Sequence, residues 1–449
     1  MKSFFITAGH NVHKEPRSHP DNYRGIFSDS RSDLPIAIGS ASPCDRSDPA
    51  SFESSKRIRS LFYLTIICCL ASTIVCAQRI TLNSGIDTVD LENKAVVELW
   101  NNYLKSDPDS LYDNPYWNTE EKRKYKSYDL LKSEGFVSPS LYYWAKSDQN
   151  IILSISKKGD HTVLQSMFYK PIDKGLITIM AIVNVVAMRE NNKWVLYNYL
   201  PYHSKGWVNK KIGTISYVYH PRHDFNSKKA KSANEFLRNL SSIFDLKIAE
   251  LTYYIAPDCD GLHHLKGFEY VFTMGALDVC GFYDPINHII YSTSQGGESN
   301  QHEIVHVMNE RFPNGHGLLL AGIAAYWGGE NANFGKPLIY HLKRVNEYLV
   351  QHQEIDLNEF TEFYSMDSKT NPQYVIGAVI CDEALKKGGI EKLKIMLNAG
   401  STDEELIETI HKELGIAPTD LNSFFRSKIS ELAKMQSFIP IDLKSVQKK

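Results

Sequence analysis

The spacing of hydrophobic and polar residues differs between the part of the chain before residue 200 and the part after it. Before residue 200, Asp90 is a good N-cap for a helix over Leu91–Leu104. Its apolar residues recur every four positions and would face a core: Leu91, Ala95, Leu99 and Tyr103. Four runs dense in β-branched residues then predict strands at Ile151–Ser156, Val163–Tyr169, Leu176–Met188 and Trp194–Tyr199. A helix followed by a strand meander predicts a small accessory α+β domain over about 78–205.

The pattern changes near Lys211. A strand, a helix and another strand follow, and a third strand at His288–Ser292 leads through a Gly-Gly turn into a helix beginning near Asn300. The chain beyond is almost wholly helical, with helices expected at Leu318–Trp327, Pro337–Gln351, Leu357–Phe363, Pro372–Lys387, Ile390–Asn398, Asp403–Glu413 and Leu421–Lys434. We therefore expect a second unit over 206–436, a mixed sheet followed by a helical part, and a tail at 437–449. The predicted class of this 449-residue chain, which is too long for one ordinary core, is α+β.

A candidate export segment precedes these units. The basic segment Lys56–Arg59 is followed by an apolar run, 61–77, that ends in the small residues a signal peptidase needs. We expect a signal peptide over 56–77, a mature chain beginning near Gln78, and export to the periplasm or the medium. The alternative is a retained membrane anchor, but a run of 17 residues is short against the ~20 that a span needs.

The first 55 residues have the composition of a disordered leader. They are polar, rich in Ser, Pro and Asp, and lack hydrophobic periodicity. Because a signal peptide does not normally stand behind such a leader, the alternative is a start assigned too far upstream.

The composition bears on two questions: whether the chain binds nucleic acid, and whether its cysteines form a disulfide. A formal net charge of −2 gives no basic surplus to neutralise phosphates, so nucleic acid is not an expected partner. Of seven cysteines, three fall in the predicted mature chain. Either Cys259 and Cys280 form a disulfide and Cys381 is buried and free, or all three are unpaired small hydrophobes.

The motif that carries chemistry is H-E-x-x-H, formed by His302, Glu303 and His306 with two apolar residues between them. On a helix, residues four apart share a face, so both imidazoles can bind one metal ion beside Glu303. Zinc lowers the pKa of a bound water to ~7, and a neighbouring carboxylate can take its proton as the water attacks an amide carbonyl. The motif predicts zinc ligands at His302 and His306 and a general base at Glu303. The alternative is a core helix with two incidentally spaced histidines.

A longer pattern surrounds this motif. The stretch 289–326 contains a strand, then G-G-E-x-x-x-H-E-I-V-H, then L-A-G-I-A-A-Y. In this order it resembles the gluzincin (peptidase MA-like) metallopeptidases, and the resemblance extends over about 211–434. It implies a sheet subdomain and a helical subdomain with a substrate cleft between them. A Y-x-x-G-A helix of that family carries a tyrosine that assists the oxyanion, and 374–378 matches it. Tyr374 is therefore either a catalytic residue or an ordinary helix-face tyrosine.

The sequence departs from the family's pattern at one ligand. The position matching the family's zinc-binding Glu is Ala321, and an alanine cannot bind zinc. No Asp or Glu stands between Glu310 and Glu330, so the second helix cannot supply a carboxylate from a shifted register. His316 is a candidate third metal ligand, with an exposed turn histidine as the alternative, and Glu330 is another candidate. Two histidines alone would hold zinc much more weakly than three ligands.

Two further features have weaker patterns. The accessory domain is vaguely similar to the NTF2-like cone, although no motif supports that similarity. The segment Asp258–Asp260, with His263 and His264, carries side chains that could bind a metal, but it matches no ligand spacing, and we expect a solvated loop.

Together these patterns predict an exported zinc metallopeptidase that hydrolyses a peptide or protein substrate. The rival interpretation is a catalytically degenerate peptidase-like protein that binds peptides or a protein partner, and Ala321 favours it. A membrane is an expected partner only if the segment 56–77 is retained as an anchor.

Overall fold

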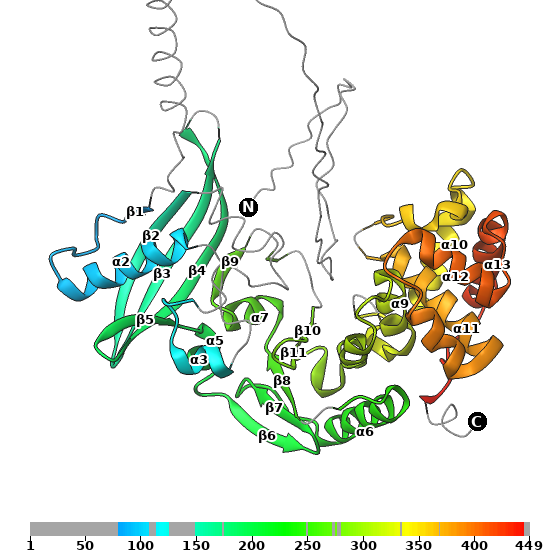
Figure 1. Cartoon of the computed structure of the whole chain (residues 1–449), viewed down its shortest axis with the longest axis horizontal. Helices are drawn as coiled ribbons and strands as arrows, with labels where there is room; N and C mark the ends of the chain where they lie inside the picture. The colour runs from blue at the N-terminus through cyan, green and yellow to red at the C-terminus, as the bar shows by residue number, and fades with distance from the viewer. Residues whose placement is uncertain are drawn as a thin grey trace, which may run out of the picture. The chain divides into compact units, whose positions relative to one another are not determined.

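Two mixed β-sheets and a set of helices make up the described chain, as the predicted α+β class requires (Figure 1). The computed structural model describes residues 80–106, 114–124, 149–172, 175–247, 250–271, 274–275, 280–332, 335–367 and 369–443. The predicted leader at 1–55, the signal segment at 56–77 and the last part of the tail lie outside the described residues. Within those ranges, no helix has the length and hydropathy of a membrane span.

The first sheet contains the predicted strand meander. Its order is β1-β2-β3-β4-β5, with β9 also paired to β4. The strands are β1 (Ile80–Leu82), β2 (Gln149–Lys158), β3 (His161–Pro171), β4 (Ile177–Glu190), β5 (Lys193–Tyr197) and β9 (Phe268–Val271). Strand β4 is long enough to pair with β9 at residues 181–183 and with β5 at 186–190. A strand from the second half of the sequence therefore completes the first sheet.

The helix α2 (Leu91–Lys105) packs against this sheet (Figure 1). Asp90 caps it as predicted, because its carboxylate accepts hydrogen bonds from the backbone N–H groups of Glu92 and Asn93. The predicted core face is wrong at its start, since the Leu91 side chain is 80% exposed. The buried face is Val96, Leu99, Trp100, Tyr103 and Leu104. A helix turns every 3.6 residues, so a face chosen by strict steps of four drifts away from the true one.

The second sheet has the order β10-β11-β8-β7-β6. Its strands are β6 (Val208–Ile212), β7 (Ile215–Tyr219), β8 (Leu251–Ala256), β10 (Phe282–Asp284) and β11 (Ile289–Thr293). The central strands β7, β8 and β11 are parallel, and the two outer strands are antiparallel. Helix α6 (Ser227–Phe244) connects β7 to β8 and buries its apolar face in the large core shared with the C-terminal helices.

A short helix stands where we expected a solvated loop, so that expectation is wrong. In α7 (Cys259–Leu265), Asp258 is the N-cap and accepts a hydrogen bond from the Gly261 N–H at 2.7 Å, and His263 is buried. Cys259 forms a disulfide with Cys280, as one of the two alternatives required, with their Cα atoms 5.7 Å apart. Cys381 is buried and free.

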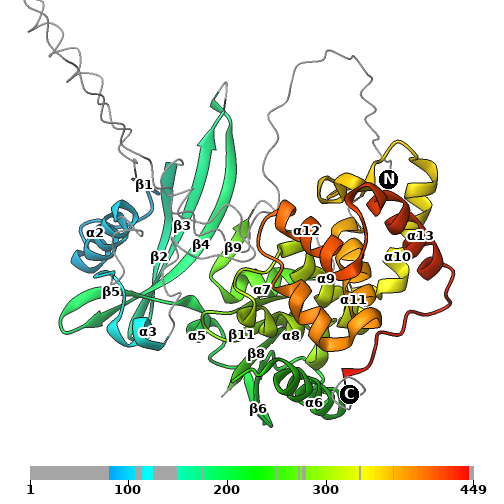
Figure 2. The ribbon, with the colours of Figure 1, turned by 45° about the vertical axis from the view of Figure 1, so that its right-hand side comes forward.

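The C-terminal half is helical, as predicted, and α9 to α13 gather together in both views (Figures 1 and 2). The helices are α8 (Gln301–His306), α9 (Gly317–Trp327), α10 (Leu338–Gln351), α11 (Pro372–Leu397), α12 (Asp403–Leu414) and α13 (Leu421–Ala433). Short 3-10 turns lie between them at η4 (Val307–Arg311), η5 (Gly329–Asn331) and η6 (Leu357–Glu362). The two helices predicted at 372–398 are confirmed, because α11 consists of two helical stretches separated by the non-helical residues Gly388 and Gly389.

Two glycines let α9 and α11 cross at very short distance. A Cβ built on Gly322 of α9 would lie 2.3 Å from the carbonyl carbon of Gly377, and one built on Gly377 of α11 would lie 2.2 Å from the carbonyl oxygen of Leu318. The neighbouring atoms belong to the backbone and cannot turn away as a side chain could. Glycine is therefore required at this crossing, which sets how closely the start of α11 approaches α9.

The crossing gives a stability prediction. Gly322→Ala should lower the free energy of unfolding by at least ~2 kcal/mol, because the added methyl group forces two backbones apart. Gly317→Ala in the same helix is the matched control, since its Cβ would meet nothing within 4 Å, and it should be neutral or slightly stabilising. Urea unfolding of the two variants measures both effects, and equal midpoints would contradict the role given to Gly322.

Candidate metal centre

The loop before α8 is held by a buried hydrogen bond between Glu298 and His223. Between β11 and α8, Glu298 is almost fully buried, and its Oε1 lies 2.9 Å from Nε2 of His223. The same oxygen accepts a hydrogen bond from the backbone N–H of Asn226, the N-cap of α6. Gly297 takes a positive φ of 62° beside it, which suits a glycine in this turn. The start of α8 is thus fixed to the beginning of α6.

The two histidines of the motif converge. Nε2 of His302 and Nε2 of His306 are 3.2 Å apart, one turn of α8 from each other. Two nitrogens bound to one tetrahedral zinc ion, each at ~2.0–2.1 Å, lie roughly 3.3–3.4 Å apart. The observed separation therefore fits a shared zinc ion without any rearrangement of the helix.

Burial keeps both imidazoles neutral, and only a neutral imidazole can bind a metal. It lowers the pKa of His302 to about 4, against the opposing effect of the carbonyl groups of Ala332 and Ala324. It lowers the pKa of His306 to about 3, with a further contribution from the neighbouring His302. Nδ1 of His302 lies 2.7 Å from the carbonyl oxygen of Ala332 and can only donate to it. The lone pair of His302 is then on Nε2, the nitrogen that faces His306.

Glu303 follows His302 in α8 and is buried. Its residue surface is 6% exposed, and burial raises the pKa of its carboxyl group to about 8. The backbone at Gly281, just before β10, forms one wall of its site, because a Cβ there would lie 3.0 Å from Oε1 of Glu303. The disulfide partner Cys280 precedes this glycine. A carboxylate in such a place is well suited to exchange a proton.

Tyr374 lies next to the histidine pair. Its ring stacks on the imidazole of His302 with centroids 5.9 Å apart and planes 24° apart. Tyr374 is in the first turn of α11, one turn before Gly377, so the close crossing with α9 brings it there. The fold thus brings together His302, Glu303, His306 and Tyr374 from α8 and α11.

The candidate third ligands are placed differently. His316 is the N-cap of α9: its Nδ1 accepts a hydrogen bond from the Leu318 N–H, and its Nε2 lies 2.9 Å from Oδ1 of Asp403. Both of its nitrogens are engaged, which gives it a structural role and lends a ligand role no support. Glu330 is exposed in η5. In the part of the chain that the structure describes, no three His, Cys, Asp or Glu side chains form a group that could hold a metal ion.

Ala321 lies one turn before Ala324 on the same face of α9, and a carbonyl contact with Ala324 places that face near His302. It is 8% exposed. The residue that replaces the expected carboxylate is therefore buried in the helix whose Ala324 carbonyl interacts with His302.

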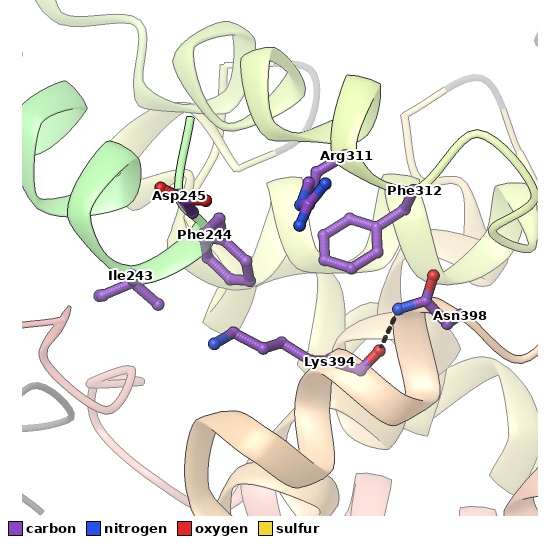
Figure 3. A pocket seen from close by; sticks show the side chains of 7 residues that line it. All are labelled: Ile243, Phe244, Asp245, Arg311, Phe312, Lys394 and Asn398. Atoms are coloured by element: carbon purple, nitrogen blue, oxygen red, sulfur yellow. Dashed lines mark hydrogen bonds between the residues drawn. The ribbon is translucent and has the colours of Figure 1, made fainter. Parts of the chain in front are cut away.

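A pocket of about 390 Å³ lies elsewhere, where α6 ends near η4 and the end of α11 (Figure 3). The side chains of Arg311 and Lys394 reach toward it beside the rings of Phe244 and Phe312. None of the predicted site residues lines this pocket. The candidate catalytic residues and this pocket thus occupy different places.

Comparison with known proteins identifies no relative: no protein-family model matches the chain, and no curated protein matches it.

The sequence patterns did not predict three residues of the site, namely Gly281, Asn309 and Ala332. Gly281 and Ala332 act through their backbone, which leaves no side-chain signal. Asn309 stands three residues after His306, where it could have been considered because residues at that spacing meet on a helix.

The buried carboxyl group predicts a pH dependence of stability. In the metal-free protein, the folded state keeps the Glu303 proton up to about pH 8, whereas the unfolded chain releases it near 4.5. The folded state binds more protons in this window, so the free energy of unfolding falls as the pH rises through it. Glu303→Gln does not titrate and should lose this fall.

Urea unfolding of chelator-treated proteins at pH 6 and pH 9 measures the difference. Between these two conditions the natural chain should lose roughly 2–3 kcal/mol more than Glu303→Gln. Parallel losses in both proteins would show that the Glu303 carboxyl group is not buried in this way.

Proposed function

We propose that this chain is a zinc-dependent metallopeptidase of the gluzincin type that cleaves peptide bonds with Glu303 as general base. The observation that carries the proposal is the 3.2 Å separation of the two Nε2 atoms on one turn of α8, beside a buried carboxyl group. Both histidines are neutral, and the Ala332 carbonyl orients His302. These features supply two of the three protein ligands of a catalytic zinc site and the general base beside them.

His302 and His306 would hold the metal, which polarises the substrate carbonyl and acidifies a water molecule. In its carboxylate form, Glu303 would accept a proton from the water whose oxygen attacks the carbonyl carbon. When the carbon–nitrogen bond breaks, Glu303 returns the proton to the leaving amine. Burial of Glu303, with the Gly281 backbone close to its carboxyl group, would keep bulk water from this exchange.

Tyr374 would assist by donating a hydrogen bond to the oxygen that gains negative charge. Its contact with the imidazole of His302 supports this role, because the ring is within reach of a carbonyl held next to the histidines.

Export is part of the proposal. The segment 56–77 has the composition of a signal peptide, and the Cys259–Cys280 disulfide is typical of proteins outside the reducing cytosol. We infer a peptide or protein substrate encountered in the periplasm or the medium.

A second candidate function is a peptide-binding or protein-binding module that has lost catalysis. Ala321 favours it, because this residue of α9 stands at the position where the gluzincin pattern has a zinc-binding Glu. The two proposals differ in whether another group completes the metal site.

The general base gives the direct activity test. Glu303→Gln should lower kcat on an unstructured protein such as casein by ~10²–10⁴-fold, because the proton acceptor is lost. His316→Gln is the control, since it changes a histidine outside the predicted reaction, and it should keep most of the activity. Hydrolysis that is equal in the natural chain and Glu303→Gln would contradict the mechanism.

Restoring the carboxylate distinguishes the two functions. If the natural site is active, Ala321→Glu should change kcat/KM by no more than roughly tenfold, because another ligand already completes the site. Peptidase assays with equimolar zinc measure this. A change from no turnover in the natural chain to clear turnover in Ala321→Glu would instead identify the natural chain as the degenerate form.

A further inference from the structure

Asn309, in the 3-10 turn η4, contacts one histidine of the pair. Its amide nitrogen lies 2.9 Å from Nδ1 of His306. We propose that Asn309 is the positioning residue that sets which nitrogen of His306 carries the proton, by turning its amide between a metal-free and a metal-bound orientation. This inference rests on the proposed zinc site and adds a residue that the H-E-x-x-H pattern does not include.

In the present arrangement the polar groups form one continuous chain of donors and acceptors. The Asn309 amide N–H donates to Nδ1 of His306, so the proton of neutral His306 is on Nε2. That Nε2–H points at Nε2 of His302, 3.2 Å away, which has a lone pair because Nδ1 of His302 donates to the Ala332 carbonyl. Without a metal, the two histidines are therefore joined by a hydrogen bond from Nε2–H of His306 to Nε2 of His302. The proton of this bond lies where zinc would bind.

This arrangement leaves one atom without a partner. Oδ1 of Asn309 is buried and accepts no hydrogen bond from a described residue. A buried amide oxygen without a donor costs about 1–3 kcal/mol, so the orientation is an expensive one. A half turn of the terminal amide group exchanges the positions of its oxygen and its nitrogen. The alternative orientation is thus available without moving the backbone.

Metal binding requires the alternative orientation. For Nε2 of His306 to offer a lone pair, its proton must be on Nδ1, and that N–H then needs an acceptor. After the half turn, Oδ1 of Asn309 stands where the amide nitrogen is now, within hydrogen-bond distance of Nδ1. The formerly unpaired oxygen becomes the acceptor. His302 needs no such change, because a backbone carbonyl already holds its Nδ1–H.

Two variants of similar size test the hydrogen-bond acceptor of Asn309 separately from the volume of its side chain. Asn309→Leu keeps the volume and removes the acceptor, and it should bind zinc ~10–100-fold more weakly in a chelator competition assay. Asn309→Asp keeps an acceptor and should bind zinc at least as tightly as the natural chain. Thermal unfolding of both metal-free variants checks that each is folded.

A measurement on the unmutated protein keeps the test independent of folding defects. In the natural full chain with ¹⁵N-labelled histidine, His306 should carry its proton on Nε2 without zinc and on Nδ1 with one equivalent of zinc. His302 should carry its proton on Nδ1 in both states. A His306 proton on the same nitrogen with and without zinc would overturn the proposal, as would Asn309→Leu binding zinc as tightly as the natural chain.

These outcomes are distinct from failure of the proposed function. If the natural chain binds zinc no better than His302→Ala, the metal site itself is wrong, and both proposals fall together. If the natural chain binds zinc through His302 while the Asn309 results are negative, the metallopeptidase proposal stands and the positioning role alone is overturned.

Discussion

The site depends on burying a six-residue helix that carries three ionisable side chains. Placing His302, Glu303 and His306 of α8 in an apolar core costs free energy unless each is neutral or hydrogen-bonded. The two imidazoles meet this constraint through the Ala332 carbonyl, the Asn309 amide and each other. Glu303 meets it by keeping its proton. In the proposed function, the same low-dielectric setting that makes burying these groups costly would make them effective in holding a metal and moving a proton.

The rest of the fold keeps α8 in that position. The buried pair of Glu298 with His223 ties the loop before α8 to the start of α6. The glycine crossing of α9 and α11 brings Tyr374 against His302. On the other side, the backbone at Gly281 closes against Glu303 beside the Cys259–Cys280 disulfide. Elements that span more than a third of the chain therefore converge on one short helix.

Much of this architecture was accessible from the sequence, and the exceptions have physical causes. Strand runs, the Asp90 cap and the histidine helix follow from local patterns, and these appear as predicted. The exposed Leu91 and the helix α7 do not, because tertiary packing decides which face of a weak pattern is buried and where a helix forms. Contacts made by the backbone of Gly281 and Ala332 leave no trace in residue type. His316 has the chemistry of a ligand, and its position at the start of α9 gives it a capping role.

The zinc content of the chain tests the central claim most directly. The measurement is elemental analysis of residues 78–449, purified without chelator, beside the His302→Ala variant. About one zinc ion per natural chain and none in the variant is the predicted result, and it would place the metal at the histidine pair. No zinc in either protein would contradict the metal site, and the non-catalytic binding function would then become the better interpretation of this fold.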